Sequence, residues 1–207
     1  MKALLLKDLY MTSKYCRSLL LLVLVFLAVS FFGQESLFFI VYPTMVAGMV
    51  PMTLISYDER GKWTQYSGSL PCSRTQLVSV KYMIGLIFSG LSWLISLVST
   101  VVRMTMDGYF SLDELLFWGT ALLVLGVLGP MLMLPFVFRF GAEKGRIGFY
   151  VMIGCLCAVS VLANGIGLQT SINLGNRWIL GIIVAVVVLL YLLSWWLSIR
   201  FYQKREL

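Results

Sequence analysis

The residues best suited to binding chemistry lie in one polar segment, residues 58–78, between two long apolar stretches. Asp58 is a good helix N-cap, so a short helix is expected to begin there. Trp63, Tyr66 and Leu70 recur at helical spacing and would form one aromatic and apolar edge. Aromatic and arginine side chains on a polar surface are typical of protein contacts, although aromatic residues also anchor loops at a lipid interface. Both interpretations stay open on these residues alone.

Catalytic and metal chemistry find little support in the sequence, which has no histidine and four cysteines. Cys155 and Cys157 are two residues apart in a predicted helix and would point to different sides, so they should not share a metal. A phosphate-binding loop needs the pattern Gly-x-x-x-x-Gly-Lys-Ser/Thr, and the sequence does not contain it. Any use of ATP would therefore require a separate ATPase polypeptide.

The elements around segment 58–78 must be membrane helices. The chain is 60% hydrophobic and only 12% charged, whereas soluble domains are about a quarter charged. A helix of about 20 apolar residues crosses a bilayer. We predict an all-α integral membrane protein, a single domain over residues 1–207, with six transmembrane helices near residues 18–33, 37–56, 79–101, 115–138, 146–164 and 177–199.

Basic residues determine the expected orientation. With both termini in the cytoplasm, only Arg103 and Arg177 of the 16 basic residues fall outside. The net charge of +7 is then a topology signal and not a sign of nucleic-acid binding. Residues 1–17 alternate lysine with leucine, which predicts an amphipathic helix on the inner leaflet, with a frayed tail as the alternative. We do not expect this segment to be a cleaved signal peptide, because its basic part is long and includes Asp8.

Two features of the predicted spans bear on function. Prolines lie inside the second and fourth spans, where they either kink helices that bend during transport or are simply tolerated: Pro43, Pro51, Pro130 and Pro135. We also expect no ionisable residue within any span. A membrane-embedded enzyme or an ion-coupled secondary carrier usually needs such a residue, so both remain alternative functions with less support.

Segment 58–78 and its flanks resemble the permeases of ABC-2-type ATP-binding-cassette transporters. The resemblance rests on Asp58-Glu59-Arg60-x-x-Trp63, on Ser69-Leu70-Pro71-x-Ser73-Arg74, on Lys81-Tyr82 and on the early Lys7-Asp8. It implies that residues 58–72 contain a coupling helix that touches a separate ATPase. The implied contact residues are Lys7, Asp8, Asp58, Glu59, Arg60, Trp63, Tyr66, Leu70 and Arg74.

Among such permeases the chain is most similar to the membrane subunits that export phenol-soluble modulins, which are amphipathic peptides. The resemblance implies an exporter of amphipathic or antimicrobial peptides in the bacterial plasma membrane. It implies two copies of the ATPase, which bind ATP and Mg²⁺, and a second copy of the same or a related permease. This chain itself would bind no cofactor and no nucleic acid, and would be surrounded by membrane lipid.

Overall fold

A computed structural model describes residues 2–32, 37–67, 73–106, 108, 110–145, 147, 150, 154 and 177–204. All regular structure in these residues is helical. The helices are α1 (Lys2–Tyr15), α2 (Arg17–Phe32), α3 (Leu37–Ala47), α4 (Val50–Arg60), α5 (Trp63–Ser67), α6 (Arg74–Met106), α7 (Leu112–Phe140) and α9 (Arg177–Lys204).

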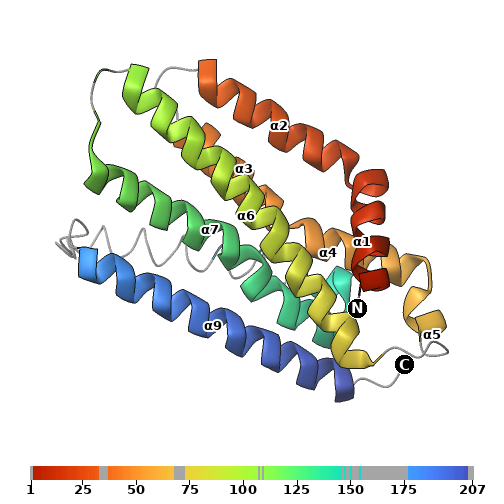
Figure 1. Cartoon of the computed structure of the whole chain (residues 1–207). Helices are drawn as coiled ribbons and strands as arrows, with labels where there is room; N and C mark the ends of the chain where they lie inside the picture. The colour runs from red at the N-terminus through yellow and green to blue at the C-terminus, as the bar shows by residue number, and fades with distance from the viewer. Residues whose placement is uncertain are drawn as a thin grey trace.

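The axes of the long helices α2, α6, α7 and α9 are roughly parallel, with α2 and α6 running one way and α7 and α9 the other, and α1 lies across them beside the first half of α6 (Figure 1). We call the end of the bundle that holds α1 and α5 the α5 end. The last turns of α4, α7 and α9 and the first turns of α6 lie there too (Figure 1). Both the beginning of α1 and the end of α9 therefore lie at one end of the molecule.

Three described helices are long and apolar enough to cross a bilayer: Arg74–Met106, Leu112–Phe140 and Leu180–Lys204. They coincide with the third, fourth and sixth predicted spans, which are confirmed as helices of this kind. The fifth predicted span, near residues 146–164, lies almost entirely outside the described residues. The count of six spans and the cytoplasmic position of the termini remain predictions.

The second predicted span, near residues 37–56, is not one continuous helix. It is divided into α3 and α4 at Gly48 and Met49. Pro51 lies in the first turn of α4, where its missing N–H would otherwise have bonded to the carbonyl of Ala47. The proline therefore begins a new helix at this position, in agreement with its preference for the first helical turn.

The two prolines of the fourth predicted span leave α7 continuous, because neighbouring helices bond to the carbonyls that they free. Pro130 removes the donor for the Gly126 carbonyl, and Ser89 of α6 donates to that oxygen at 3.0 Å. Pro135 likewise frees the Met131 carbonyl, to which Ser194 of α9 donates. In a membrane such carbonyls must be satisfied within the protein, so these serines also fix α6 and α9 against α7.

This pairing of proline and serine can be tested by a double-mutant cycle. We expect Ser194→Ala to lower the free energy of unfolding by about 1 kcal/mol, as interhelical hydrogen bonds in membranes do. In a Pro135→Ala background the same change should cost less, because residue 135 then donates to the Met131 carbonyl. Unfolding in detergent gives both values. Ser198→Ala is the control and should cost the same in either background; equal costs for Ser194→Ala would refute the pairing.

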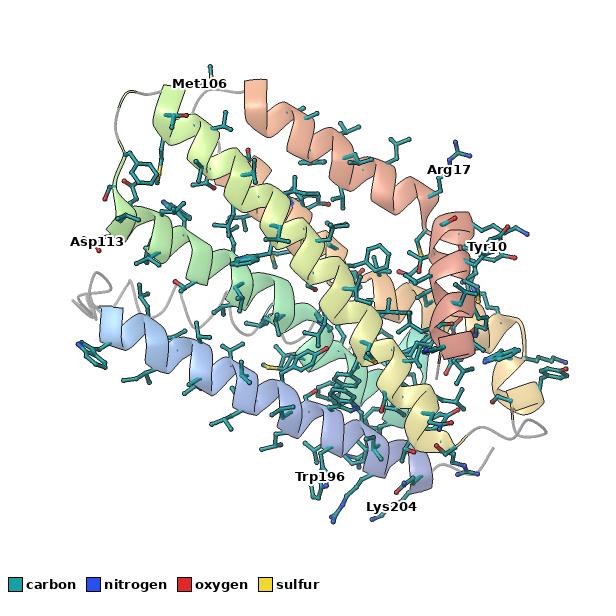
Figure 2. The ribbon with its side chains drawn as sticks, viewed as in Figure 1. Tyr10, Arg17, Met106, Asp113, Trp196 and Lys204 are labelled. Atoms are coloured by element: carbon teal, nitrogen blue, oxygen red, sulfur yellow. The ribbon has the colours of Figure 1, made fainter. Side chains whose placement is uncertain are left out.

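Two groups of buried side chains hold the α5 end together. One joins α4, α6, α7 and α9 and includes Ile55, Tyr82, Leu134 and Tyr202. The other joins α1 to α4 and α6 through Leu4, Cys16, Leu54, Val80 and Ile84. Helix α1 is therefore packed against the bundle on one side, and its opposite side carries Tyr10, which is 76% exposed and points away from the bundle (Figure 2).

Candidate partner-binding surface and the charge cluster beneath it

The structure corrects the predicted helix over residues 58–72. Asp58, Glu59 and Arg60 form the last turn of α4, so Asp58 does not cap a new helix. The chain turns at Gly61 and Lys62, and Lys62 has the left-handed φ of 52° that ends a helix. The short helix α5 starts only at Trp63. Leu70 and Pro71 lie outside the described residues.

The exposed part of this segment combines aromatic rings with a basic side chain. Trp63 and Tyr66 lie one turn apart on α5, with ring centroids 5.6 Å apart. Tyr66 is 60% exposed, and Arg60 is exposed as well. Trp63 is half-buried, and Lys7 Nζ of α1 lies 4.0 Å from the centre of its ring. We call Arg60, Trp63 and Tyr66 the α4–α5 surface.

Two other predicted contact residues are used to join elements of the chain. Glu59 accepts a hydrogen bond from the Ala142 backbone N–H at 2.9 Å, which attaches the turn after α7 to α4. Arg74 donates to the Gln203 carbonyl of α9 at 3.0 Å. Ser73 and Gln76 cap the start of α6, the helix that Arg74 begins. The Gln76 backbone N–H donates to the Ser73 hydroxyl, and the Ser73 backbone N–H donates to the Gln76 side-chain oxygen.

Four charged side chains from α1, α4 and α6 form a closed cluster beneath this surface. Lys81 Nζ lies 2.6 Å from both Asp8 Oδ2 and Asp58 Oδ2. Lys7 Nζ lies 3.0 Å from both Asp8 Oδ1 and Asp58 Oδ1. Each carboxylate thus touches both ammonium groups, and opposite charges alternate around a ring. We call these four residues the charge cluster.

Burial separates the charge cluster from the exposed surface. The side chains of Asp8, Asp58 and Lys81 are only 3%, 6% and 9% exposed, and that of Lys7 is 25% exposed. The structure thus brings together three residues that the sequence proposed as partner contacts, Lys7, Asp8 and Asp58. It places the two carboxylates inside the protein, where a partner's side chains would reach them only after a rearrangement.

Lys81 is the member of the cluster that sequence reasoning missed. We expected no ionisable residue in any span, but Lys81 lies in the range of the third predicted span and is buried in the continuous helix α6. A lysine at such a position requires a partner because a buried charge is costly. Asp8, an acid among the leucines of α1, was the signal that could have revealed the pair.

Cys16, at the junction of α1 and α2, is buried beside the same cluster. Burial raises the pKa of the Cys16 thiol above its ordinary value, and the ammonium of Lys81 lowers it only in part. Because the thiolate is the reactive form, Cys16 is an inert packing residue.

A groove of about 330 Å³ extends the α4–α5 surface toward the end of α7. Its lining includes Glu59 and Arg60 from α4, and Glu143 and Lys144 from the turn after α7. Glu143 and Lys144 are exposed and were not among the predicted contact residues. They could not be found from sequence, because they are far from segment 58–78 in the chain and only the fold places them beside Arg60.

The fold and this surface define a helical membrane protein with a charged and aromatic face at one end of its bundle. The family model described as ABC-2 family transporter protein matches residues 3–203. The chain therefore belongs to the ABC-2 transporter family, and this assignment indicates the permease component of an ABC transporter. No curated protein and no solved structure matches it significantly.

Proposed function

We propose that this chain is the transmembrane permease subunit of a bacterial ATP-binding-cassette exporter and that the α4–α5 surface docks a separate ATPase. The α4–α5 surface is the observation that carries the proposal. It combines the exposed Arg60 at the end of α4 with the half-buried Trp63 and the exposed Tyr66 of the short helix α5, which lies between α4 and the long helix α6. Such residues provide large contact area at low entropic cost and are enriched among the residues that dominate binding energy.

The position of the α4–α5 surface in the bundle supports this proposal. The α5 end also holds the first turn of α1 and the last turn of α9 (Figure 1). If the termini are cytoplasmic, the surface faces the compartment that contains ATP. Two ATPase subunits would bind ATP and Mg²⁺ and would act on two permease copies, either identical or related, in the plasma membrane.

For the substrate we propose amphipathic peptides of the phenol-soluble-modulin or antimicrobial kind. Besides the motif resemblance, this substrate class is supported by an apolar groove of about 370 Å³ between α6, α7 and α9. Leu86, Trp93, Leu123, Tyr191 and Trp195 are among its lining residues, and none of the described residues that line it is charged. Such a groove suits the apolar side of an amphiphile, which a membrane-embedded path must accommodate.

The docking proposal is tested by the double substitution Arg60→Ala and Trp63→Ala. We expect the variant to insert normally, to retain less than a tenth of ATPase recruitment in a pull-down, and to lose export of a fluorescent amphipathic peptide. Losing a central interface anchor typically costs about 2 kcal/mol or more. Tyr66→Ala should act in the same direction, and it leaves the contact between Lys7 and Trp63 in place.

Trp178→Ala is the matched control, because Trp178 is 83% exposed and lies in the first turn of α9, at the other end of the bundle. It should leave both recruitment and export unchanged. The lipid-anchor interpretation predicts the reverse for the double variant, namely normal recruitment with poor membrane insertion. If recruitment and export both survive the double substitution, the α4–α5 surface is not the docking site.

A further inference from the structure

The charge cluster is positioned between the docking surface and the membrane helices. Asp58 lies two residues before the exposed Arg60, in the same turn of α4. Lys7 contacts both Asp58 and the ring of Trp63 on α5. From Asp58 the cluster continues through Lys81 to α6, and through Asp8 to α1, which leads directly into α2.

The charges of the cluster compensate one another only while α1, α4 and α6 keep their relative positions. Burying two carboxylates and an ammonium group costs free energy, which their mutual contacts offset only in good geometry. Removing one member leaves an uncompensated buried charge. The position of Lys81 matters most, because its single ammonium group donates hydrogen bonds to both Asp8 and Asp58, each at 2.6 Å. A displacement of α4 alone would therefore break contacts on which both α1 and α6 depend.

The cluster borders a small cavity. A cavity of about 40 Å³ lies against the cluster and is lined also by Leu4, Trp63 and Ser67. It has room for two or three water molecules, since a cavity needs roughly 10–15 Å³ of such volume to hold one. Lys7 Nζ lies 3.0 Å from Asp8 Oδ1, but this oxygen accepts no hydrogen bond from the described residues, so a water in the cavity would satisfy it.

We infer that Lys81 is a positioning residue that fastens α1 and α6 to the α4–α5 surface, so that these helices move as one body when the ATPase partner moves that surface. This inference rests on the proposed function. Helix α1, besides lying at the membrane surface, would then transmit the motion of the α4–α5 surface. Through α1 the motion reaches α2, and through Lys81 it reaches the long span α6.

The test uses the full chain in complex with its ATPase, reconstituted in lipid nanodiscs. Lys81→Met alone leaves two buried carboxylates with only the ammonium group of Lys7 to balance them, and is expected to fold poorly. The informative variant is therefore the triple substitution Asp8→Asn, Asp58→Asn and Lys81→Met, which removes the three most buried charges together and keeps side chains of similar size. Replacing buried ionic groups together is often neutral for stability. Lys14→Met, a change at an exposed lysine of α1, is the matched control.

The readout is the motion of α1, which a merely structural role would not affect. A spin label at Tyr10→Cys reports the ATP-dependent displacement of α1 relative to a second label at Phe110→Cys, in a chain with the native cysteines replaced. Tyr10 and Phe110 are 76% and 56% exposed. We expect the triple variant to fold and to recruit the ATPase within about twofold of the parent chain. It should lose the ATP-dependent displacement of α1, and its export per ATP hydrolysed should fall at least tenfold.

A triple variant that exports normally, or that keeps the shift of α1, would overturn the inference and leave the proposed function intact. A triple variant that folds poorly like Lys81→Met would also overturn it, because the cluster would then be needed for folding and not specifically for transmission. If the parent chain itself recruits no ATPase, the proposed function fails and the inference fails with it.

Discussion

Replacing Tyr82 with alanine is expected to lower the free energy of unfolding by about 3 kcal/mol, the lower end of the range for buried aromatic residues. Tyr82 of α6 is fully buried and joins α6 to α9. Its ring stacks on Trp195 at a centroid distance of 5.6 Å and meets Tyr191 edge-on at 5.4 Å. The lower end applies because lipid, unlike water, adds little driving force for burying an apolar ring.

The hydroxyl group of Tyr82 contributes a smaller part of the free energy of unfolding, and this part can be measured separately. Ser194 uses its single proton on the Met131 carbonyl, so Tyr82 must donate to Ser194 at 2.8 Å and accept from Ser198 at 2.6 Å. Tyr82→Phe removes both bonds but keeps the ring, and should cost about 1 kcal/mol. Thermal unfolding in detergent, followed by tryptophan fluorescence, measures both variants.

The exposed tyrosine Tyr10 provides the control for this measurement. Tyr10→Ala removes the same atoms from a side chain that is 76% exposed, and should leave unfolding nearly unchanged. If Tyr82→Ala were no more destabilising than Tyr10→Ala, the attachment of α9 to α6 would not depend on this residue. If Tyr82→Phe cost as much as Tyr82→Ala, the hydroxyl group and not the ring would carry the effect.

The second large effect is expected at the break between α3 and α4. A methyl group added to Gly48 would lie 2.8 Å from the Gly126 carbonyl oxygen and 3.0 Å from Pro130 Cδ. Neither atom can move easily, because one is backbone and the other belongs to a proline ring inside α7. Gly48→Ala should therefore push α3 and α4 away from α7 and destabilise the protein by about 2 kcal/mol, as overpacked cores do.

Gly90 of α6 offers a matched control for the same chemical change. A methyl group there would meet no atom of the described residues within 4 Å, so Gly90→Ala should be neutral or stabilise the helix by less than about 1 kcal/mol. The two variants are compared by thermal unfolding of the purified chain. A neutral result for Gly48→Ala would contradict the close packing of Gly48 against α7.

The apolar stretches of the sequence were sufficient to predict the long helices α6, α7 and α9. Their length and hydropathy are local properties, and a bilayer requires helices from any such stretch. The break at Gly48 and Met49 had a local signal in Pro51, which we read only as a possible kink. The prolines of α7 predicted that the freed carbonyls of Gly126 and Met131 would need new donors. They did not indicate that Ser89 and Ser194 would provide them.

The same division applies to the candidate site. Residue types alone directed attention to Arg60, Trp63 and Tyr66, because aromatic and arginine side chains in a polar segment are unusual whatever the fold. Sequence reasoning also grouped Asp58 with these exposed residues, and the structure buries it. The sequence did not show that Asp58 belongs to the last turn of α4 instead of the start of a new helix. The helix boundary depends on the position of the turn at Lys62, which the sequence did not reveal.

The sequence by itself determined that this protein belongs in a membrane, where its long helices α6, α7 and α9 lie, and which segment carries the aromatic and basic residues of the proposed docking surface. Only the tertiary structure decided that Lys7, Asp8, Asp58 and Lys81 meet in one buried cluster. The physical reason is that hydropathy and helical period act over neighbouring residues, whereas ion pairing in the interior depends on separations of 51 and 73 positions along the chain. Such contacts arise only when α1, α4 and α6 pack together, and packing chooses which of the possible charge partners come within reach.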